Sequence, residues 1–291
     1  MTIDNIFQPI VIAGHEVNYD FLQLTPITHN VKDSFTFSYG GFTWVICTNV
    51  DQGPNGGGLT VFKEVNGILT FHANLFTGRY KMWAPRVVIE DDVLYVLVTD
   101  TQGTGNEPDW YNHMRAFKFQ YAIFSPTNWC SNPGKIVVGD DSFGIIDVEL
   151  FKIGEFYYLC YVIMDWHQGE WWDLWCSCAN NWSGPFTSPN KVNFSGATEH
   201  GIEEAPCYNK DDGMFYFSVN DSATISSLRR GYLISSGINA DGSQILNLSE
   251  DDMFRMQDVS GGLCTHPDFW KGKIRATGKG VHGYHIMEQI I

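Results

Sequence analysis

One pattern recurs five times along this chain of 291 residues, and it limits the fold more than any other feature. Each copy has two short runs of β-branched or aromatic residues joined by a turn, which is typical of a β-hairpin. Helical periodicity is nearly absent. The predicted hairpins span residues 35–47, 87–98, 150–162, 207–219 and 268–277.

The spacing of these hairpins predicts the architecture. They recur about every 50–65 residues, and a repeat of this kind without helices is typical of four-stranded sheets arranged radially. No linker rich in Pro, Gly or Ser divides the chain. We therefore predict an all-β fold, a single five-bladed β-propeller domain over residues 1–291, with a two-sheet sandwich as the structural alternative.

Charge and aromatic content narrow the class of partner. The chain has 18 basic and 33 acidic residues, a formal charge of −15. It therefore lacks the basic footprint that nucleic acids require, and the same charge argues against binding to an anionic membrane. Aromatic residues make up 15% of the chain, and they serve both as strand formers and as platforms for sugar rings.

The cysteines bear on the compartment. There are seven, an odd number, and most lie in apolar runs typical of strands, which favours buried thiols over disulfides. Buried thiols indicate a reducing, cytoplasmic compartment. The first residues show no basic segment followed by an apolar one, so no signal peptide is visible, although a secreted mature form stays open.

Carboxylates precede three of the hairpins. Asp33 lies before the first, Asp147 before the third, and Glu203 and Glu204 before the fourth. In a propeller the innermost strands begin near one axis, so these acids would converge there. Paired carboxylates can supply the acid and the base of glycoside hydrolysis. An isolated Asp before a hairpin, however, is often only a turn residue.

Short motifs around these acids resemble glycoside hydrolase family 43, and its relative family 62. They occur in the family's order over most of the chain, at residues 32–37, 83–87, 146–151, 183–189, 204–206 and 265–267. The resemblance implies a five-bladed catalytic propeller that inverts anomeric configuration. It also implies that Asp33 is the general base, Asp147 modulates the pKa of the acid, and Glu204 is the general acid.

The chain departs from the family pattern at three of these sites. Ser34 and Val148 replace the proline that follows each Asp, and Ala205 replaces the glycine after Glu204. Proline there shapes the backbone and does no chemistry. Glu203 is the alternative acid, but only one of two successive strand residues can face the axis.

Other residues are weaker candidates for the site. The resemblance implies that His266 helps to hold a central calcium ion, which would be structural and is not required for the chemistry; the alternative is a hydrogen-bonded core histidine. Trp83 could stack on a sugar or fill the blade. The remaining substrate-binding candidates are Phe37, Trp44, Arg86 and Arg230.

Two classes of function fit this sequence. The first is a glycoside hydrolase acting on an oligosaccharide or polysaccharide that contains arabinose, xylose or galactose, as the resemblance implies. The second is a non-catalytic carbohydrate-binding propeller, such as a phage-type receptor-binding protein. Retention of all three acids favours the hydrolase. A phosphorylase would need a cluster of basic residues for phosphate, and here the basic residues are dispersed.

Overall fold

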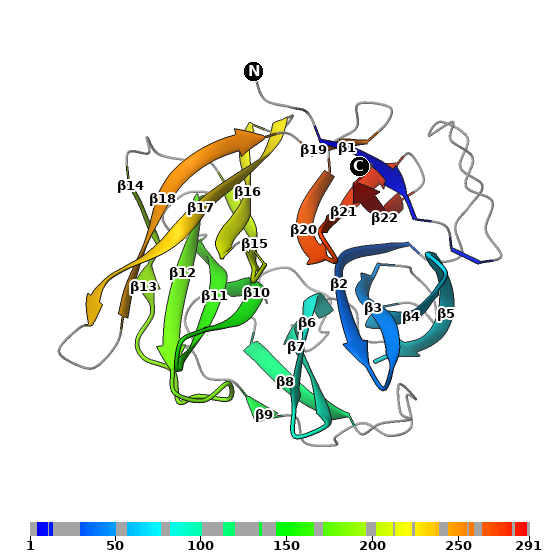
Figure 1. Ribbon diagram of the computed structural model, residues 1–291, viewed down its shortest axis with the longest axis horizontal. Helices are drawn as coiled ribbons and strands as arrows, with labels where there is room; N and C mark the ends of the chain where they lie inside the picture. The colour runs from blue at the N-terminus through cyan, green and yellow to red at the C-terminus, as the bar shows by residue number, and fades with distance from the viewer. Residues whose placement is uncertain are drawn as a thin grey trace.

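The computed structural model describes residues 5–10, 12–13, 30–50, 57–76, 82–100, 113–119, 134–135, 144–165, 171–195, 202–211, 213–222, 225–238, 244–254, 256–258, 264–280 and 283–289. Figure 1 shows these segments as five sheets arranged around a common centre. Strands are the only regular elements in these ranges, so no helix there is long and apolar enough to span a membrane. The predicted five-bladed β-propeller is confirmed.

The first three blades follow one another along the chain, and each is a four-stranded antiparallel sheet in sequence order. Blade 1 contains β2 (Val31–Tyr39), β3 (Phe42–Asn49), β4 (Leu59–Val65) and β5 (Ile68–Leu75). Blade 2 contains β6 (Met82–Glu90), β7 (Val93–Asp100), β8 (His113–Phe119) and β9 (Gly134–Lys135). Blade 3 contains β10 (Gly144–Ile153), β11 (Phe156–Asp165), β12 (Trp171–Ala179) and β13 (Asn190–Lys191).

The last two blades have five strands each. Blade 4 has the order β14 (Asn193–Ser195), β18 (Gln244–Phe254), β17 (Ile225–Ile238), β16 (Met214–Ser222) and β15 (Ile202–Asn209). Blade 5 has the order β19 (Met256–Asp258), β1 (Asn5–Pro9), β22 (Gly283–Gln289), β21 (Lys273–Gly280) and β20 (Cys264–Trp270).

The two ends of the chain close the ring. Strand β1 pairs antiparallel with β22, so that Phe7 lies opposite Gln289, and it pairs parallel with β19 on its other side. The innermost strands β2, β6, β10, β15 and β20 contact one another in cyclic order, with β20 returning to β2. Blade 5 therefore joins the amino-terminal strand to the carboxy-terminal ones.

Tight turns fix the register of the hairpins. Four turns have two central residues, both with positive φ, which is the type I′ geometry that suits the twist of paired strands. They are Gly40-Gly41, Asn66-Gly67, Asp91-Asp92 and Lys271-Gly272. Three of these turns join the first two strands of a predicted hairpin. Their Gly and Asp residues favour positive φ, and this is why the hairpins could be predicted from the sequence.

The hydrophobic core is divided among the junctions between blades. Buried side chains form five clusters in the described part of the chain. The cluster between blades 1 and 2, for example, joins Phe37 and Ile46 to Leu94 and Val96. The six cysteines in the described ranges are buried thiols, as predicted, while Cys130 lies outside those ranges. Packing between neighbouring blades therefore holds the ring together.

Removal of the Phe7 side chain should test the closure of the ring. Phe7 is fully buried and packs with Tyr216 and Met287, so it links the amino-terminal strand to blades 4 and 5. We expect Phe7→Ala to lower the free energy of unfolding by about 3–5 kcal/mol, as for other buried Phe residues. Denaturant unfolding would measure this, with the partly exposed neighbour Gln8→Ala as the control. A loss below about 1 kcal/mol would show that β1 does not close the ring.

Candidate active site

Each inner strand carries a β-bulge near its start, and the five bulges are equivalent. The register shifts once in each of β2, β6, β10, β15 and β20, between the residue before and the residue two after a left-handed position. The left-handed residues have φ between 47° and 56°, and they are Asp33, Ala84, Asp147, Ala205 and His266. A bulge re-aims the side chain that it carries, and bulges are common beside active sites.

Side chains from the preceding blade hold three of these bulges. The N–H of Asp33 donates to Thr277 Oγ1 at 2.8 Å, and the N–H of Ala84 donates to Thr48 Oγ1 at 3.0 Å. The N–H of Ala205 donates to Asp147 Oδ2 at 3.1 Å. The same geometry therefore repeats around the axis with different acceptors.

Two of the predicted acids meet a histidine on the axis. Nε2 of His266 lies 3.3 Å from Asp33 Oδ1 and 3.4 Å from Asp147 Oδ2. Both carboxylates are almost fully buried, with side-chain exposures of 1% and 4%. Residues separated by more than 100 positions are thus brought together because all three occupy equivalent bulges.

The charges of this triad stabilise one another. Burial alone disfavours an imidazolium, but Asp33 and Asp147 outweigh it and raise the pKa of His266 to about 9. Burial alone would raise the pKa of Asp147, but the charge of His266 outweighs it and lowers that pKa below its usual value. At neutral pH, His266 is therefore protonated and Asp147 is ionised.

Asp33 has the clearest capacity to accept a proton from a ligand. Neither of its carboxylate oxygens has a hydrogen-bond donor among the described residues. Two cationic groups are nearby, because Lys32 Nζ lies 3.4 Å from Asp33 Oδ2 and His266 lies on the other side. Lys32 Nζ also lies 4.4 Å from the centre of the Trp83 ring, which places Trp83 beside the triad.

Lys32 is a site residue that sequence reasoning missed. It lies in the motif at residues 32–37 that contains Asp33, and a lysine gives no signal there without knowledge of the bulge. Lys32, Trp83 and Glu204 each come directly before the left-handed residue of their strand, so they occupy equivalent positions. The side chains of Glu203 and Glu204 lie outside the described part, but Glu204 pairs with Ser218 through its backbone.

A second polar layer lies two residues further along the inner strands. Arg86 is 4% exposed, and its Nε donates to Glu149 Oε2 at 2.6 Å. Burial disfavours the charge of Arg86, but Glu149 outweighs it, so the pKa of Arg86 is above its usual value. Glu149 Oε1 accepts the N–H of Tyr208, and Asp268 Oδ2 accepts the N–H of Thr36. Arg86 was predicted to bind substrate, but the structure gives it this buried ion pair.

Two other candidates, Phe37 and Trp44, lie away from His266, and the side chain of a third, Arg230, is outside the described part of the chain. Phe37 and Trp44 lie near the hairpin end of β2 and β3, where both are buried in the core between blades 1 and 2. Nε1 of Trp44 donates to the carbonyl oxygen of Tyr39 at 3.0 Å. Arg230 lies on β17, the third strand outward in blade 4, and its side chain is outside the described part.

The calcium ion implied by the resemblance was tested against the residues present. Nε2 of His266 lies at ion-pair distance from the carboxylates of Asp33 and Asp147, which it contacts directly. Within the described ranges, no group of three or more His, Cys, Asp or Glu side chains is arranged to hold a metal ion. The described residues therefore do not fit a directly ligated calcium, and the ion stays a prediction from the resemblance.

The charged triad should make the stability of the protein depend on pH through His266. Its stabilisation is fully present below the unfolded pKa of about 6.5 and is lost as the pH rises through about 9. We expect the difference in free energy of unfolding between wild type and His266→Gln to fall by about 3 kcal/mol from pH 6 to pH 10.

Denaturant unfolding of both proteins across this range would measure the difference. His72→Gln is the control. His72 is an exposed residue of β5 whose pKa is lowered by partial burial, so the effect of its substitution on stability should not change between pH 6.5 and pH 9. A difference for His266→Gln that does not change with pH would show that the imidazole is neutral in the folded protein.

Comparisons with known proteins show the same architecture. No protein-family model matches the sequence, and a search of curated proteins finds no match. Among solved structures, an α-L-arabinofuranosidase from Lactobacillus brevis matches with a TM-score of 0.62 and 12% identity, covering 89% of this chain and 90% of that one. An endo-1,4-β-xylanase from Bacteroides thetaiotaomicron matches with a TM-score of 0.60 and 15% identity, covering 89% of this chain and 90% of that one.

A third match is a family-43 endo-arabinanase from Bacillus licheniformis, with a TM-score of 0.58 and 15% identity over 91% of this chain and 95% of that one. At these identities the likeness concerns the fold. The chain therefore has the five-bladed β-propeller fold of family-43 glycoside hydrolases, as its motifs predicted.

Proposed function

We propose that this protein is a glycoside hydrolase that cleaves a glycosidic bond with inversion of configuration. The observation that carries the proposal is the pair of buried carboxylates, Asp33 and Asp147, which lie on the axis on either side of His266. Hydrolysis of a glycoside needs one carboxylate as a base and one carboxylic acid at the leaving oxygen. The triad supplies Asp33 for the base and places Asp147 beside the backbone that follows Glu204, the residue assigned below as the acid.

Asp33 is assigned as the general base. Its oxygens are without a hydrogen-bond donor among the described residues, so they can accept a proton from a water molecule. That water attacks the anomeric carbon from the face opposite the leaving group, which inverts the configuration. The neighbouring cations Lys32 and His266 lie 3.4 Å and 3.3 Å from its two oxygens and attract its negative charge.

Glu204 is assigned as the general acid, and Asp147 as the residue that prepares it. Asp147 Oδ2 accepts the N–H of Ala205, the residue that follows Glu204, so it fixes the backbone at the acid. Because the pKa of Asp147 is low, Asp147 carries a negative charge there. A nearby negative charge raises the pKa of a second carboxylic acid, which keeps Glu204 protonated until it donates to the leaving oxygen.

Position also favours Glu204 over Glu203. Glu204 is equivalent to Lys32 and Trp83, and the Lys32 side chain reaches both Asp33 and the Trp83 ring. Glu203 is one residue out of phase with these positions, and successive strand residues face opposite sides. The substrate-facing position of the fourth inner strand is therefore assigned to Glu204.

The substrate proposed is an oligosaccharide or polysaccharide that contains arabinose, xylose or galactose. The structures that share the fold are named for action on arabinofuranosides, arabinan and xylan, which supports the first two sugars. Trp83, partly buried beside Lys32, offers an aromatic face next to the triad on which a sugar ring could stack.

Substitution of the proposed base and acid should abolish turnover while the fold persists. We expect Asp33→Asn and Glu204→Gln each to lower kcat by about 10²–10⁴, because each removes a proton-transfer group. A panel of aryl glycosides and plant polysaccharides would measure activity, and thermal unfolding would verify folding. Glu203→Gln is the matched control and should stay within about threefold of wild type. Near-normal turnover in Asp33→Asn or Glu204→Gln would remove that residue from the mechanism.

The stereochemical outcome is a separate prediction. Proton NMR of the first product formed should show the anomer opposite to that of the substrate, because the water attacks in one step. A retained anomer would assign a carboxylate as nucleophile and remove the water-activating role from Asp33. Sugar binding with no turnover on any substrate would indicate the non-catalytic carbohydrate-binding propeller instead.

A further inference from the structure

A cavity lies along the inner strands beyond their bulges, on the hairpin side of the triad. Its walls come from the inner strands after their bulges and from the hairpin turns that follow, and it has a volume of about 730 Å³. None of the five bulge residues lines it. The volume is within the roughly 300–1,000 Å³ typical of small-molecule sites.

The walls of this cavity are aromatic. Six rings line it, from Phe35, Phe37, Phe151, Tyr208, Phe269 and Trp270. The rings of Phe151 and Tyr208 stack with centroids 4.5 Å apart, and the rings of Phe35 and Phe37 stack at 6.4 Å, so blades 1, 3 and 4 each contribute packed aromatic side chains to the wall. Flat aromatic faces pack against the apolar C–H faces of ring-shaped ligands.

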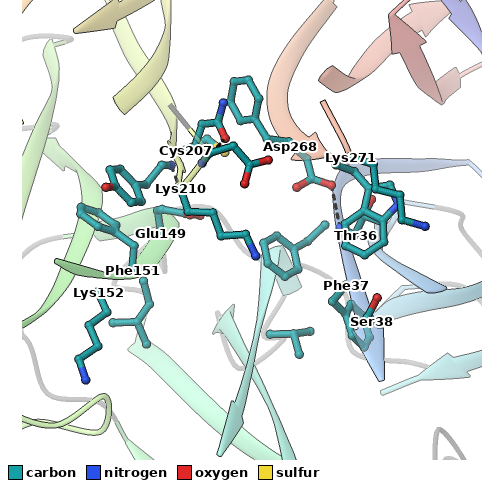
Figure 2. A pocket seen from close by; sticks show the side chains of 18 of the residues that line it. Thr36, Phe37, Ser38, Glu149, Phe151, Lys152, Cys207, Lys210, Asp268 and Lys271 are labelled. Atoms are coloured by element: carbon teal, nitrogen blue, oxygen red, sulfur yellow. Dashed lines mark hydrogen bonds between the residues drawn. The ribbon is translucent and has the colours of Figure 1, made fainter. Parts of the chain in front are cut away.

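Polar groups lie at two depths of the cavity. Asp268, which is 2% exposed, forms part of the inner wall, and one carboxylate oxygen accepts the N–H of Thr36 at 2.7 Å. Figure 2 shows its other oxygen turned toward the middle of the cavity. Lys210 is exposed on the hairpin turn of blade 4, and Figure 2 shows its side chain extending across the opening.

These charges select the kind of ligand. A cation would be repelled by the three lysines of the lining, Lys152, Lys210 and Lys271, and an anion by its three acids, Glu149, Asp211 and Asp268, so neither charge has an excess of partners. A neutral ring with several hydroxyl groups avoids both penalties, because a hydroxyl can donate to Asp268 while another accepts from Lys210. Such a ring also presents the C–H faces that the aromatic walls require.

We propose that this cavity is a second carbohydrate-binding site that takes a sugar unit of a neutral oligosaccharide. The buried Arg86–Glu149 pair, with Arg86 5.2 Å from the Phe35 ring, lies between the cavity and the triad. The site can therefore bind a glycan without contacting the residues assigned to hydrolysis. The inference rests on the proposed function only for the choice of glycans to test.

The experiment is calorimetric titration of the Asp33→Asn protein, which leaves substrates intact if the hydrolase proposal is correct. Xylo-, arabino- and galacto-oligosaccharides are the probes. Each is titrated into Asp33→Asn alone and into proteins that also carry Trp270→Ala or Lys210→Ala. We expect each added substitution to weaken one class of sites at least about tenfold, because Trp270 supplies a stacking face and Lys210 a donor. Exposed Lys191, on blade 3 away from the cavity lining, gives the control Lys191→Ala.

The outcomes separate the two proposals. If Asp33→Asn binds sugar at two classes of sites, and Trp270→Ala and Lys210→Ala each remove the same one of these classes, the result supports both the hydrolase and the second carbohydrate site. One class that these substitutions remove, with no turnover by the wild type, supports the second site and contradicts the hydrolase. Unchanged affinities in both Trp270→Ala and Lys210→Ala, or no binding of any probe below about 10 mM, would overturn the second site. Lys210→Ala alters an exposed turn residue, so its result stands even if Trp270→Ala unfolds.

Discussion

The left-handed residue in each inner strand determines how the axis of this propeller is built. A non-glycine residue in that conformation costs roughly 1–2 kcal/mol, so the surrounding structure must hold it. In three blades the holding contact is a hydrogen bond from the left-handed N–H to Thr277, Thr48 or Asp147 of the preceding blade. The contact that holds a bulge thus also joins two blades. Closure of the ring and the shape of the site have one physical origin.

The repeated bulge explains how a nearly symmetric scaffold carries an asymmetric site. Ala84 and Ala205 occupy two of the five equivalent positions, and their small side chains leave space on the axis. Asp33, Asp147 and His266 occupy the other three, so two carboxylates surround one imidazolium. Two buried carboxylates without a cation would repel each other, and one would take up a proton. His266 lies between the two carboxylates, and its positive charge offsets their mutual repulsion.

The sequence was sufficient to predict the parts of this structure that depend on local pattern. Hairpins are recognisable from alternating runs and turn residues, and acids in phase with them could be expected at the axis. The roles of neighbouring residues depended on the bulge, which the sequence signals only where proline follows, as at Pro85, Pro206 and Pro267. Ser34 and Val148 lack that signal.

Contacts between blades were beyond prediction, because they join residues far apart in the chain. Arg86 meets Glu149 across 63 positions, and Thr36 meets Asp268 across 232. The sequence predicts Phe37 and Trp44 as substrate-binding residues, and aromatic side chains can stack on sugar rings. An inner strand has two ends, however, and these residues belong to the hairpin end, where they pack between blades. Only the three-dimensional register distinguishes the two ends.

The second polar layer, formed by Arg86, Glu149 and Asp268, lies between the triad and the cavity at the hairpin ends of the inner strands. Three residues beyond the left-handed position, the N–H groups of Tyr208 and Thr36 donate to Glu149 and Asp268 of the preceding blade, which repeats the device that holds the bulges. Arg86 balances the charge of Glu149, and Asp268 is held by the N–H of Thr36. A ligand at the hairpin end therefore meets groups that are already held by neighbouring blades. The acids at the other end keep the charges that His266 and Lys32 set for them.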